Sequence, residues 1–206
     1  MATNLFETPT TELQAVNQML RGIGEQPFNT LANATTVEAN QAKKLLGTVN
    51  RSVQSKGWHF NTEDDYTLSI DANSNFVLPA NTLKMKPGST MIGRDVVLRG
   101  NGGNQMVYDR TNRTFAFSGV SELKVNLVLL IQFETLPEPA RNYITVRATR
   151  QFQDNFQGDT NDYTIKKTDE IEAKADMDTD EAEAADHNVL TGTWNMFETT
   201  MHGRRA

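Results

Sequence analysis

The sequence predicts an α+β protein in which an α-helical bundle carries an inserted antiparallel β domain. Apolar residues recur at helical spacing before residue 57 and again after residue 137, whereas short runs separated by turn residues fill the stretch between. A predicted helix that ends at Gly57 leads directly into Trp58 and Phe60, and here the sequence pattern changes from helical to strand-like. We expect a helical body made of two parts, 1–63 and 137–187. The inserted β domain is expected at 64–136, and a C-terminal tail at 188–206.

The composition narrows the possible functions. A chain of 206 residues is long enough for one large domain or for a body plus a small module, and its mean hydropathy of -0.54 is polar. No apolar run approaches the roughly 18 residues of a membrane helix, and the N-terminus has no signal-peptide pattern. Cysteine is absent, which excludes disulfides and thiolate metal sites. The net charge of -6 argues against general nucleic-acid binding, which needs clustered Lys and Arg.

The first helix is expected to begin near residue 8. Thr8 is the predicted N-cap, with Pro9 at the first helical position, where its missing N–H costs nothing. Gly24 is the predicted end of the helix. The apolar stripe at helical spacing consists of Leu13, Val16, Leu20 and Ile23.

A second, longer helix is expected from Thr35, which forms a predicted capping box with Glu38. Its apolar stripe consists of Ala42, Leu45, Leu46, Val49 and Val53. Gly57 is expected to adopt the left-handed conformation that ends helices. Trp58 and Phe60 then begin a strand as two buried anchors, so that Trp58→Ala is predicted to cost roughly 3–5 kcal/mol.

The β domain is expected to hold short antiparallel strands in a small sandwich or barrel-like module. Turn residues punctuate the predicted strands, for example the run GNGGN at 100–104. The predicted strands are 66–70, 76–79, 82–86, 95–99, 105–109, 114–117 and 124–133.

Two helices are expected after Pro137. The first buries a stripe of Ala140, Ile144, Ala148 and Phe152. The second, over 161–186, is highly charged, with predicted ion pairs from Glu170 to Lys166 and Lys174. Its stripe is mostly alanine, with Ile165, Ile171 and Met177, which predicts weak attachment to its own chain.

The C-terminal tail carries large apolar residues that nothing nearby in sequence can bury. They are candidates for an interface with a partner: Val189, Leu190, Trp194, Met196 and Phe197. A tail that folds back on its own body is the alternative.

No catalytic, cofactor or metal site is expected. A phosphate loop needs a helix after its glycines, but GNGGN precedes a predicted strand, which favours a hairpin turn. The run Asp176–Glu181 starts like a calcium loop but lacks Gly at position six and Glu at position twelve. The two arginines of DRTNR, at 109–113, fit an ordinary solvated turn better than a nucleic-acid contact. Paired carboxylates at Glu63, Asp64 and Asp65 leave a polysaccharide hydrolase as the alternative to a non-enzymatic protein.

Several segments closely resemble one known family. They are AVNQMLRGIGEQP at 15–27, SVQSKGWHFN at 52–61, VYDRT at 107–111 and LPEPARNYITVRATRQFQDNF at 136–156. Together they resemble the tail tubular protein A family, the head–tail adaptors or gatekeepers of short-tailed phages (podoviruses) of the autographivirus type. The resemblance covers most of residues 11–158.

This resemblance implies a structural virion protein of the phage tail, made in the host cytoplasm. It further implies a dodecameric ring, with the portal protein on one face and tail tubular protein B, the nozzle, on the other. Genomic DNA would pass through the lumen of this connector during ejection without sequence-specific binding. An acidic lumen would repel the phosphates of that DNA.

Overall fold

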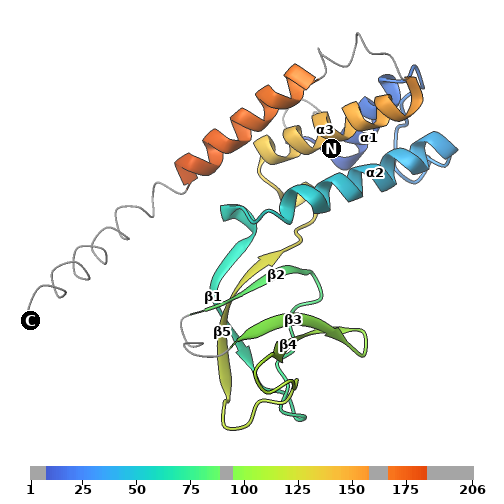
Figure 1. Ribbon diagram of the computed structural model, residues 1–206. Helices are drawn as coiled ribbons and strands as arrows, with labels where there is room; N and C mark the ends of the chain where they lie inside the picture. Colours follow the sequence, from blue (N-terminus) through green and yellow to red (C-terminus); the bar gives the residue numbers. More distant parts are fainter. Residues whose placement is uncertain (1–7, 89–94, 158–166, 185–206) are drawn as a thin grey trace, which may run out of the picture. The chain divides into compact units, whose positions relative to one another are not determined.

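The computed structural model describes residues 8–88, 95–157 and 167–184. Helices and antiparallel strands are both present, which confirms the predicted α+β class (Figure 1). The labelled helices and strands are α1 (Glu12–Arg21), α2 (Val37–Gln54), η1 (His59–Asn61), β1 (Thr62–Ser69), β2 (Thr82–Pro87), β3 (Val96–Asn101), β4 (Asn104–Asp109), β5 (Glu122–Leu129), η2 (Phe133–Thr135) and α3 (Glu138–Gln157). A further α-helix, here called the acidic helix, covers 167–184.

The chain divides into two compact units. The helical unit comprises residues 1–49 and 133–206, and the β unit comprises residues 50–132. The division falls inside α2, upstream of Gly57. The division into the four segments 1–63, 64–136, 137–187 and 188–206 stays a prediction.

The N-cap of helix α1 lies three residues after the predicted cap, Thr8. Thr11 is the N-cap, and it forms a capping box with Gln14: each side chain accepts from the other's backbone N–H, over 3.2 and 2.8 Å. The prediction of Thr8 is wrong because Thr10 is held outside the helix, where its N–H and hydroxyl donate to the Glu138 carboxylate. The helix ends at Gly22 rather than Gly24.

Helix α2 bears out the predicted stripe but not the predicted cap. The Thr36 hydroxyl accepts from the Ala39 N–H over 3.2 Å, so the cap lies one residue after Thr35. Gly57 has a φ of 86° and follows the end of the helix, as predicted. A Cβ on Gly57 would lie 3.0 Å from Val128 Cγ2, so the position needs glycine for space as well as conformation. Leu45 is half-buried, and the remaining stripe residues are at most 2% exposed: Ala42, Leu46, Val49 and Val53.

The aromatic residues after Gly57 do not begin a strand. The Asn61 side chain accepts from the Trp58 N–H over 2.8 Å, and this contact closes the short 3-10 helix η1. The rings of Trp58 and Phe60 stack with centroids 6.5 Å apart, and both side chains remain half-buried. Two of the buried side chains at this junction are instead polar, since Gln54 and Asn61 are 0% and 2% exposed.

The β unit contains two antiparallel sheets in its described residues. One has the strand order β1-β5-β2, and the other is the hairpin of β3 and β4 (Figure 1). Alternate residues of β5, Leu123, Val125 and Leu127, are buried as expected for a strand with one face on a core. The core cluster consists of Leu68, Phe76, Leu78, Val96, Val107, Phe117, Leu123, Val125 and Leu127.

Two predicted strands are absent as strands. Residues 76–79 and 114–117 make only isolated bridges in the structure. They still supply the two largest core side chains, since the rings of Phe76 and Phe117 meet edge to face at 5.2 Å. The predicted strand 124–133 also ends early, at Leu129, and the described residues form two small sheets around one core rather than a barrel.

The helical unit packs α1 beside α3 (Figure 1). The Gln153 side chain in α3 donates to the Gly22 carbonyl at the end of α1 over 2.9 Å. Arg141, 8% exposed, donates to the carbonyls of Leu136, Thr10 and Glu134, and so holds the start of α3 to the segment before α1. The predicted stripe of α3 is buried: Ala140, Ile144, Ala148 and Phe152.

Candidate functional site: assembly surfaces

The five predicted interface residues lie outside the described residues, as do Ile165 and Lys166. They are Val189, Leu190, Trp194, Met196 and Phe197. The surfaces on which assembly can be judged are therefore those of the acidic helix, α2 and α3, together with the pockets and charged turns nearby.

The acidic helix is attached to α3 through a carboxylate between two guanidinium groups. Glu170 Oε1 lies 3.7 Å from Arg147 Nε, and Glu170 Oε2 accepts from Arg150 Nε. The predicted Glu170–Lys174 pair is wrong, because Lys174 pairs with Asp178 instead. The two arginines offer Glu170 a site where its side chain is only 16% exposed, whereas the side chain of Lys174 is 40% exposed.

Little apolar surface of the acidic helix is buried. Ala173 and Met177 are 5% and 2% exposed, while Ile171 is 59% exposed. One methionine and one alanine contribute only about 2–4 kcal/mol by burial. Attachment to α3 is therefore modest, as the alanine-rich stripe predicts.

The acidic helix carries the net charge of the whole protein. Its eight carboxylates and two lysines give a net charge of -6, and the rest of the chain holds 18 residues of each sign. Exposed carboxylates recur at intervals of three and four residues, which puts them along one side of the helix. This acidic stripe consists of Asp169, Glu172, Asp176, Asp180 and Glu183.

A groove of about 290 Å³ lies between α2 and the C-terminal half of α3. Its apolar wall is formed by Leu45, Phe152 and Phe156, and the Phe152 and Phe156 rings lie 4.8 Å apart. Phe156 is 44% exposed. The polar lining consists of Gln41, Lys44, Thr48 and Asn155. We call this surface the α2–α3 groove.

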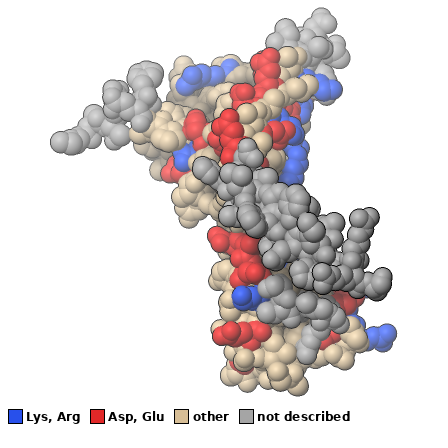
Figure 2. Space-filling view, turned by 90° about the vertical axis from the view of Figure 1, so that its left-hand side faces the viewer, with Lys and Arg blue, Asp and Glu red and all other residues tan. Residues whose placement is uncertain are grey.

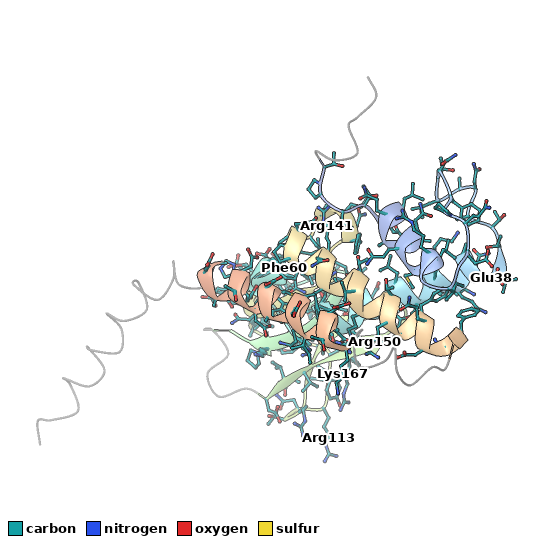
Figure 3. The ribbon with its side chains drawn as sticks, turned by 90° about the horizontal axis from the view of Figure 1, so that it is seen from above. Glu38, Phe60, Arg113, Arg141, Arg150 and Lys167 are labelled. Atoms are coloured by element: carbon teal, nitrogen blue, oxygen red, sulfur yellow. The ribbon has the colours of Figure 1, made fainter. Side chains whose placement is uncertain are left out.

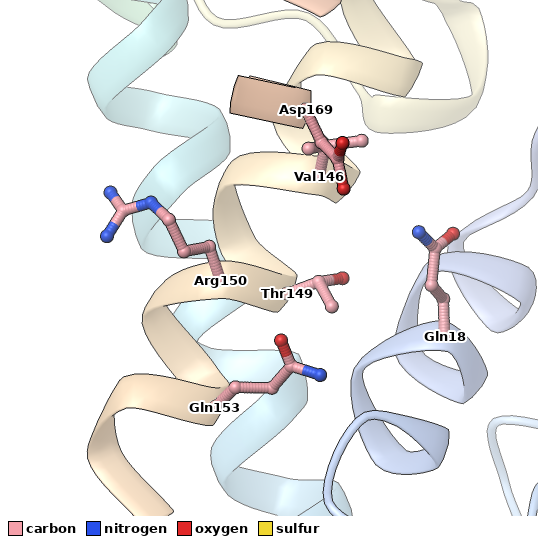
Figure 4. Close-up of a pocket in the computed structure, with 6 residues that line it drawn as sticks. All are labelled: Gln18, Val146, Thr149, Arg150, Gln153 and Asp169. Atoms are coloured by element: carbon pink, nitrogen blue, oxygen red, sulfur yellow. The ribbon is translucent and has the colours of Figure 1, made fainter. Parts of the chain in front are cut away.

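A second pocket, of about 240 Å³, is lined mostly by polar residues and lies between α1, α3 and the start of the acidic helix. Figure 4 shows Thr149 and Gln153 directed towards Gln18, while Arg150 points away from Gln18. The Thr149 hydroxyl is buried and has no hydrogen-bond partner among the described residues. The lining holds no grouping of acid, base and nucleophile that would suit catalysis.

The carboxylates considered for polysaccharide hydrolysis lie on an exposed strand. Glu63, Asp64 and Asp65 are all exposed on β1, an edge strand of its sheet. A register shift falls between Glu63 and Tyr66, and Asp65 has a φ of 50°. Neither pocket described above includes any of these carboxylates. The geometry therefore gives the hydrolase alternative no support.

The remaining motifs have the structures expected of ordinary turns and helices. Gly102 and Gly103, with φ of 58° and 85°, form the two-residue turn between β3 and β4 and precede no helix. Asp176–Glu181 is helical, and the described residues contain no group of three or more potential metal ligands.

The arginine turn of the β unit is solvated. Arg110 pairs with Asp95 over 3.2 Å, and both side chains are 56% exposed. Arg113 extends away from the neighbouring side chains (Figure 3). Figure 2 views one face of the molecule and shows Asp and Glu interspersed with Lys and Arg over its described parts, without a continuous basic surface.

Sequence reasoning missed several buried polar residues, and three of them join segments that are distant in the sequence. Gln54, Asn61 and Arg141 are 0%, 2% and 8% exposed, and each bonds to backbone carbonyls of other segments. The available signal is positional: Gln54 follows the last stripe residue of α2, and Arg141 lies between Ala140 and Ile144 in the stripe of α3.

Comparison with known proteins agrees with a structural role. The family model for tail tubular protein matches residues 13–187, which include most of both compact units. No curated protein matches the chain. Among the described residues, every helix is too short or too polar to cross a membrane. The match extends over most of the chain, so this protein belongs to the tail tubular protein family, a family of structural proteins of the podovirus virion tail.

Proposed function

We propose that this protein is the adaptor subunit that joins the portal to the tail nozzle and forms part of the DNA-ejection conduit. In this proposal, copies assemble into a dodecameric ring with the portal protein on one face and tail tubular protein B on the other. The observation that carries the proposal is the concentration of the entire net charge of -6 on one weakly attached helix of a tail tubular protein.

A conduit for DNA needs a wall that does not bind phosphate. The acidic stripe supplies five exposed carboxylates in a row, and such a row repels a polyanion that passes beside it. We therefore propose that the stripe faces the lumen. Lysine and arginine at the same positions would bind phosphates and retard transit.

A ring also needs surfaces that a single copy leaves incomplete. The exposed Ile171 and Phe156, and the apolar residues of the tail, are candidates for burial between neighbours or against the portal. We propose that the tail, 188–206, provides the anchors for the portal or a neighbouring copy. We also propose that the β unit is an insertion that leaves the helical unit to form the body of the ring.

Mass measurement tests the assembly directly. The protein alone, and the protein mixed with portal rings, would be weighed by native mass spectrometry. A complex that contains one portal ring and twelve copies is the expected result, and further addition of nozzle protein should extend it. A chain that never associates with portal rings would contradict the adaptor function.

Two variants separate the parts of the proposal. Removal of 188–206 should leave the circular dichroism of the remainder nearly unchanged and abolish attachment to portal rings. Replacement of the five stripe carboxylates by their amides should permit ring assembly but increase retention of duplex DNA by the assembled rings. Equal DNA retention before and after the change would exclude the stripe from the lumen.

A further inference from the structure

The α2–α3 groove has the composition of a docking site for an aromatic side chain that is followed by a carboxylate. Leu45, Phe152 and Phe156 give an apolar wall, and Lys44 lies at its polar side. Phe156 remains 44% exposed in a single chain, so a good part of this apolar surface is available to a partner. A volume of about 290 Å³ lies at the lower end of ligand clefts and suits a side chain rather than a large molecule.

The sequence of this chain contains a matching segment. The last 22 residues, 185–206, include Trp194, Met196 and Phe197, and Phe197 is followed directly by Glu198. An aromatic ring in the groove would bury the exposed apolar wall, and the adjacent carboxylate would lie within reach of the Lys44 ammonium. In protein interfaces, aromatic side chains buried in pockets supply much of the binding energy, and charge pairs at the edges add specificity.

We infer that the α2–α3 groove receives the Trp194–Glu198 segment of a neighbouring copy. The inference rests on the proposed ring and names the contact between its subunits. A contact between a groove on one copy and a segment of the next copy is heterologous, and heterologous contacts form a ring when the rotation between successive copies closes. A segment that docked into the groove of its own chain would use both surfaces and leave neither for a neighbour.

The absence of cysteine permits a direct test by cross-linking. Thr48 lines the groove and is exposed, and Thr199 follows the proposed anchor segment without being part of it. Full-length Thr48→Cys and Thr199→Cys proteins, one of them carrying an affinity tag, would be mixed and treated with a short bis-maleimide. The expected product is a mixed dimer, identified by its mass and by peptides that join residue 48 to residue 199.

The matched control is Gly47→Cys mixed with Thr199→Cys. Gly47 is exposed on the same helix, and a Cβ there meets no atom within 4 Å, so the substitution changes the direction of the thiol and little else. The Thr48→Cys mixture should give several-fold more mixed dimer than this control. Equal yields would overturn the inference.

Two further measurements keep the inference and the adaptor function distinguishable. In a dilute double variant, Thr48→Cys with Thr199→Cys, a cross-link within one chain would overturn docking between copies. Native mass spectrometry of the unmodified protein, alone and with portal rings, reports assembly independently. Rings that form without the 48–199 link leave the adaptor function intact and overturn the groove as the contact. A protein that stays monomeric in both conditions overturns both.

Discussion

The Gln54 side chain pairs with the backbone of Ile131 through both edges of its amide. Its Nε2 donates to the Ile131 carbonyl over 2.8 Å, and its Oε1 accepts from the Ile131 N–H over 2.8 Å. Asn61 completes the junction, since its Nδ2 donates to the carbonyls of Gln54 and Leu129. These bonds join the start of the β unit to its end, 77 residues later in the sequence.

We predict that Gln54→Ala lowers the free energy of unfolding by about 2–4 kcal/mol, because it leaves both backbone groups of Ile131 without their partner. Gln54→Glu should be at least as harmful, because a carboxylate cannot donate to the Ile131 carbonyl. Thermal unfolding followed by circular dichroism measures both. Gln41→Ala, at an exposed position of the same helix, is the control and should change little. A Gln54→Ala protein as stable as this control would contradict the role of the amide.

Gly57 and Gly47 should respond oppositely to alanine. Gly57→Ala places a Cβ at a φ of 86° and 3.0 Å from Val128 Cγ2, so we expect a loss of at least about 1–2 kcal/mol. Gly47 is in the middle of α2 with open space around it, so Gly47→Ala should stabilise by up to about 1 kcal/mol. Midpoints of urea unfolding compare the two. Equal shifts would show that backbone conformation does not decide the outcome at Gly57.

Trp58→Ala should cost about 1–2 kcal/mol rather than the 3–5 kcal/mol expected of a fully buried ring. The ring is half-buried, and its indole N–H donates to the Val53 carbonyl over 2.8 Å. Trp58→Phe keeps the ring beside Phe60 and removes only this donor, so it should account for about 1 kcal/mol of the loss. The two unfolding midpoints, compared with the unmodified protein, test this order. A loss as large as the original expectation would indicate a buried indole.

Arg141→Lys should lower the stability of the helical unit by about 2–3 kcal/mol although the charge is kept. A lysine ammonium cannot reproduce the guanidinium contacts to the carbonyls of Leu136, Thr10 and Glu134. Hydrogen exchange at the start of α1 and α3 should accelerate together. Arg21→Lys, an exposed position in the last turn of α1, is the control. Unchanged exchange in Arg141→Lys would mean that any buried cation suffices.

Glu170→Gln should loosen the acidic helix from α3. Removal of the charge between Arg147 and Arg150 should cost about 1 kcal/mol and accelerate exchange over 167–184. Added salt should loosen the unmodified protein more than the variant, because screening acts on the pair that the variant lacks. Glu172→Gln, on the exposed stripe, supplies the control. If both variants exchange alike, the ion pair does not hold the helix.

Local rules predict the local parts of this fold. Helical spacing identifies the buried stripes of α2 and α3, and glycine chemistry identifies the ends at Gly57 and the turn at Gly102. Each depends on residues a few positions apart. Thr8 fails as a cap because Thr10 donates to the carboxylate of Glu138, 128 residues after Thr10, and so stays outside the helix.

The failures share this dependence on distant partners. The alternation of Trp58 and Phe60 predicts a strand, but Asn61 accepts from the Trp58 N–H and a 3-10 helix forms instead. Glu170 has a lysine one turn away in sequence, yet two arginines of α3 offer a less exposed site. Phe76 and Phe117 belong to the core without belonging to strands, because a core selects volume and burial rather than ladder bonds. The candidate interface consists of residues after 184, which lie outside the described residues, so its assignment depends on their amino-acid types alone.

The amide pairing of Gln54 with Ile131 has a mechanical consequence. A pull along the chain from α2 towards α3 meets this joint before it meets the sheet, because the two ends of the β unit are already bonded to each other. Tension therefore passes directly through the Gln54–Ile131 hydrogen bonds. While these bonds hold, the strands between residues 54 and 131 carry no load. The chain can in this way transmit force from α2 to α3 while the strands of the β unit stay paired.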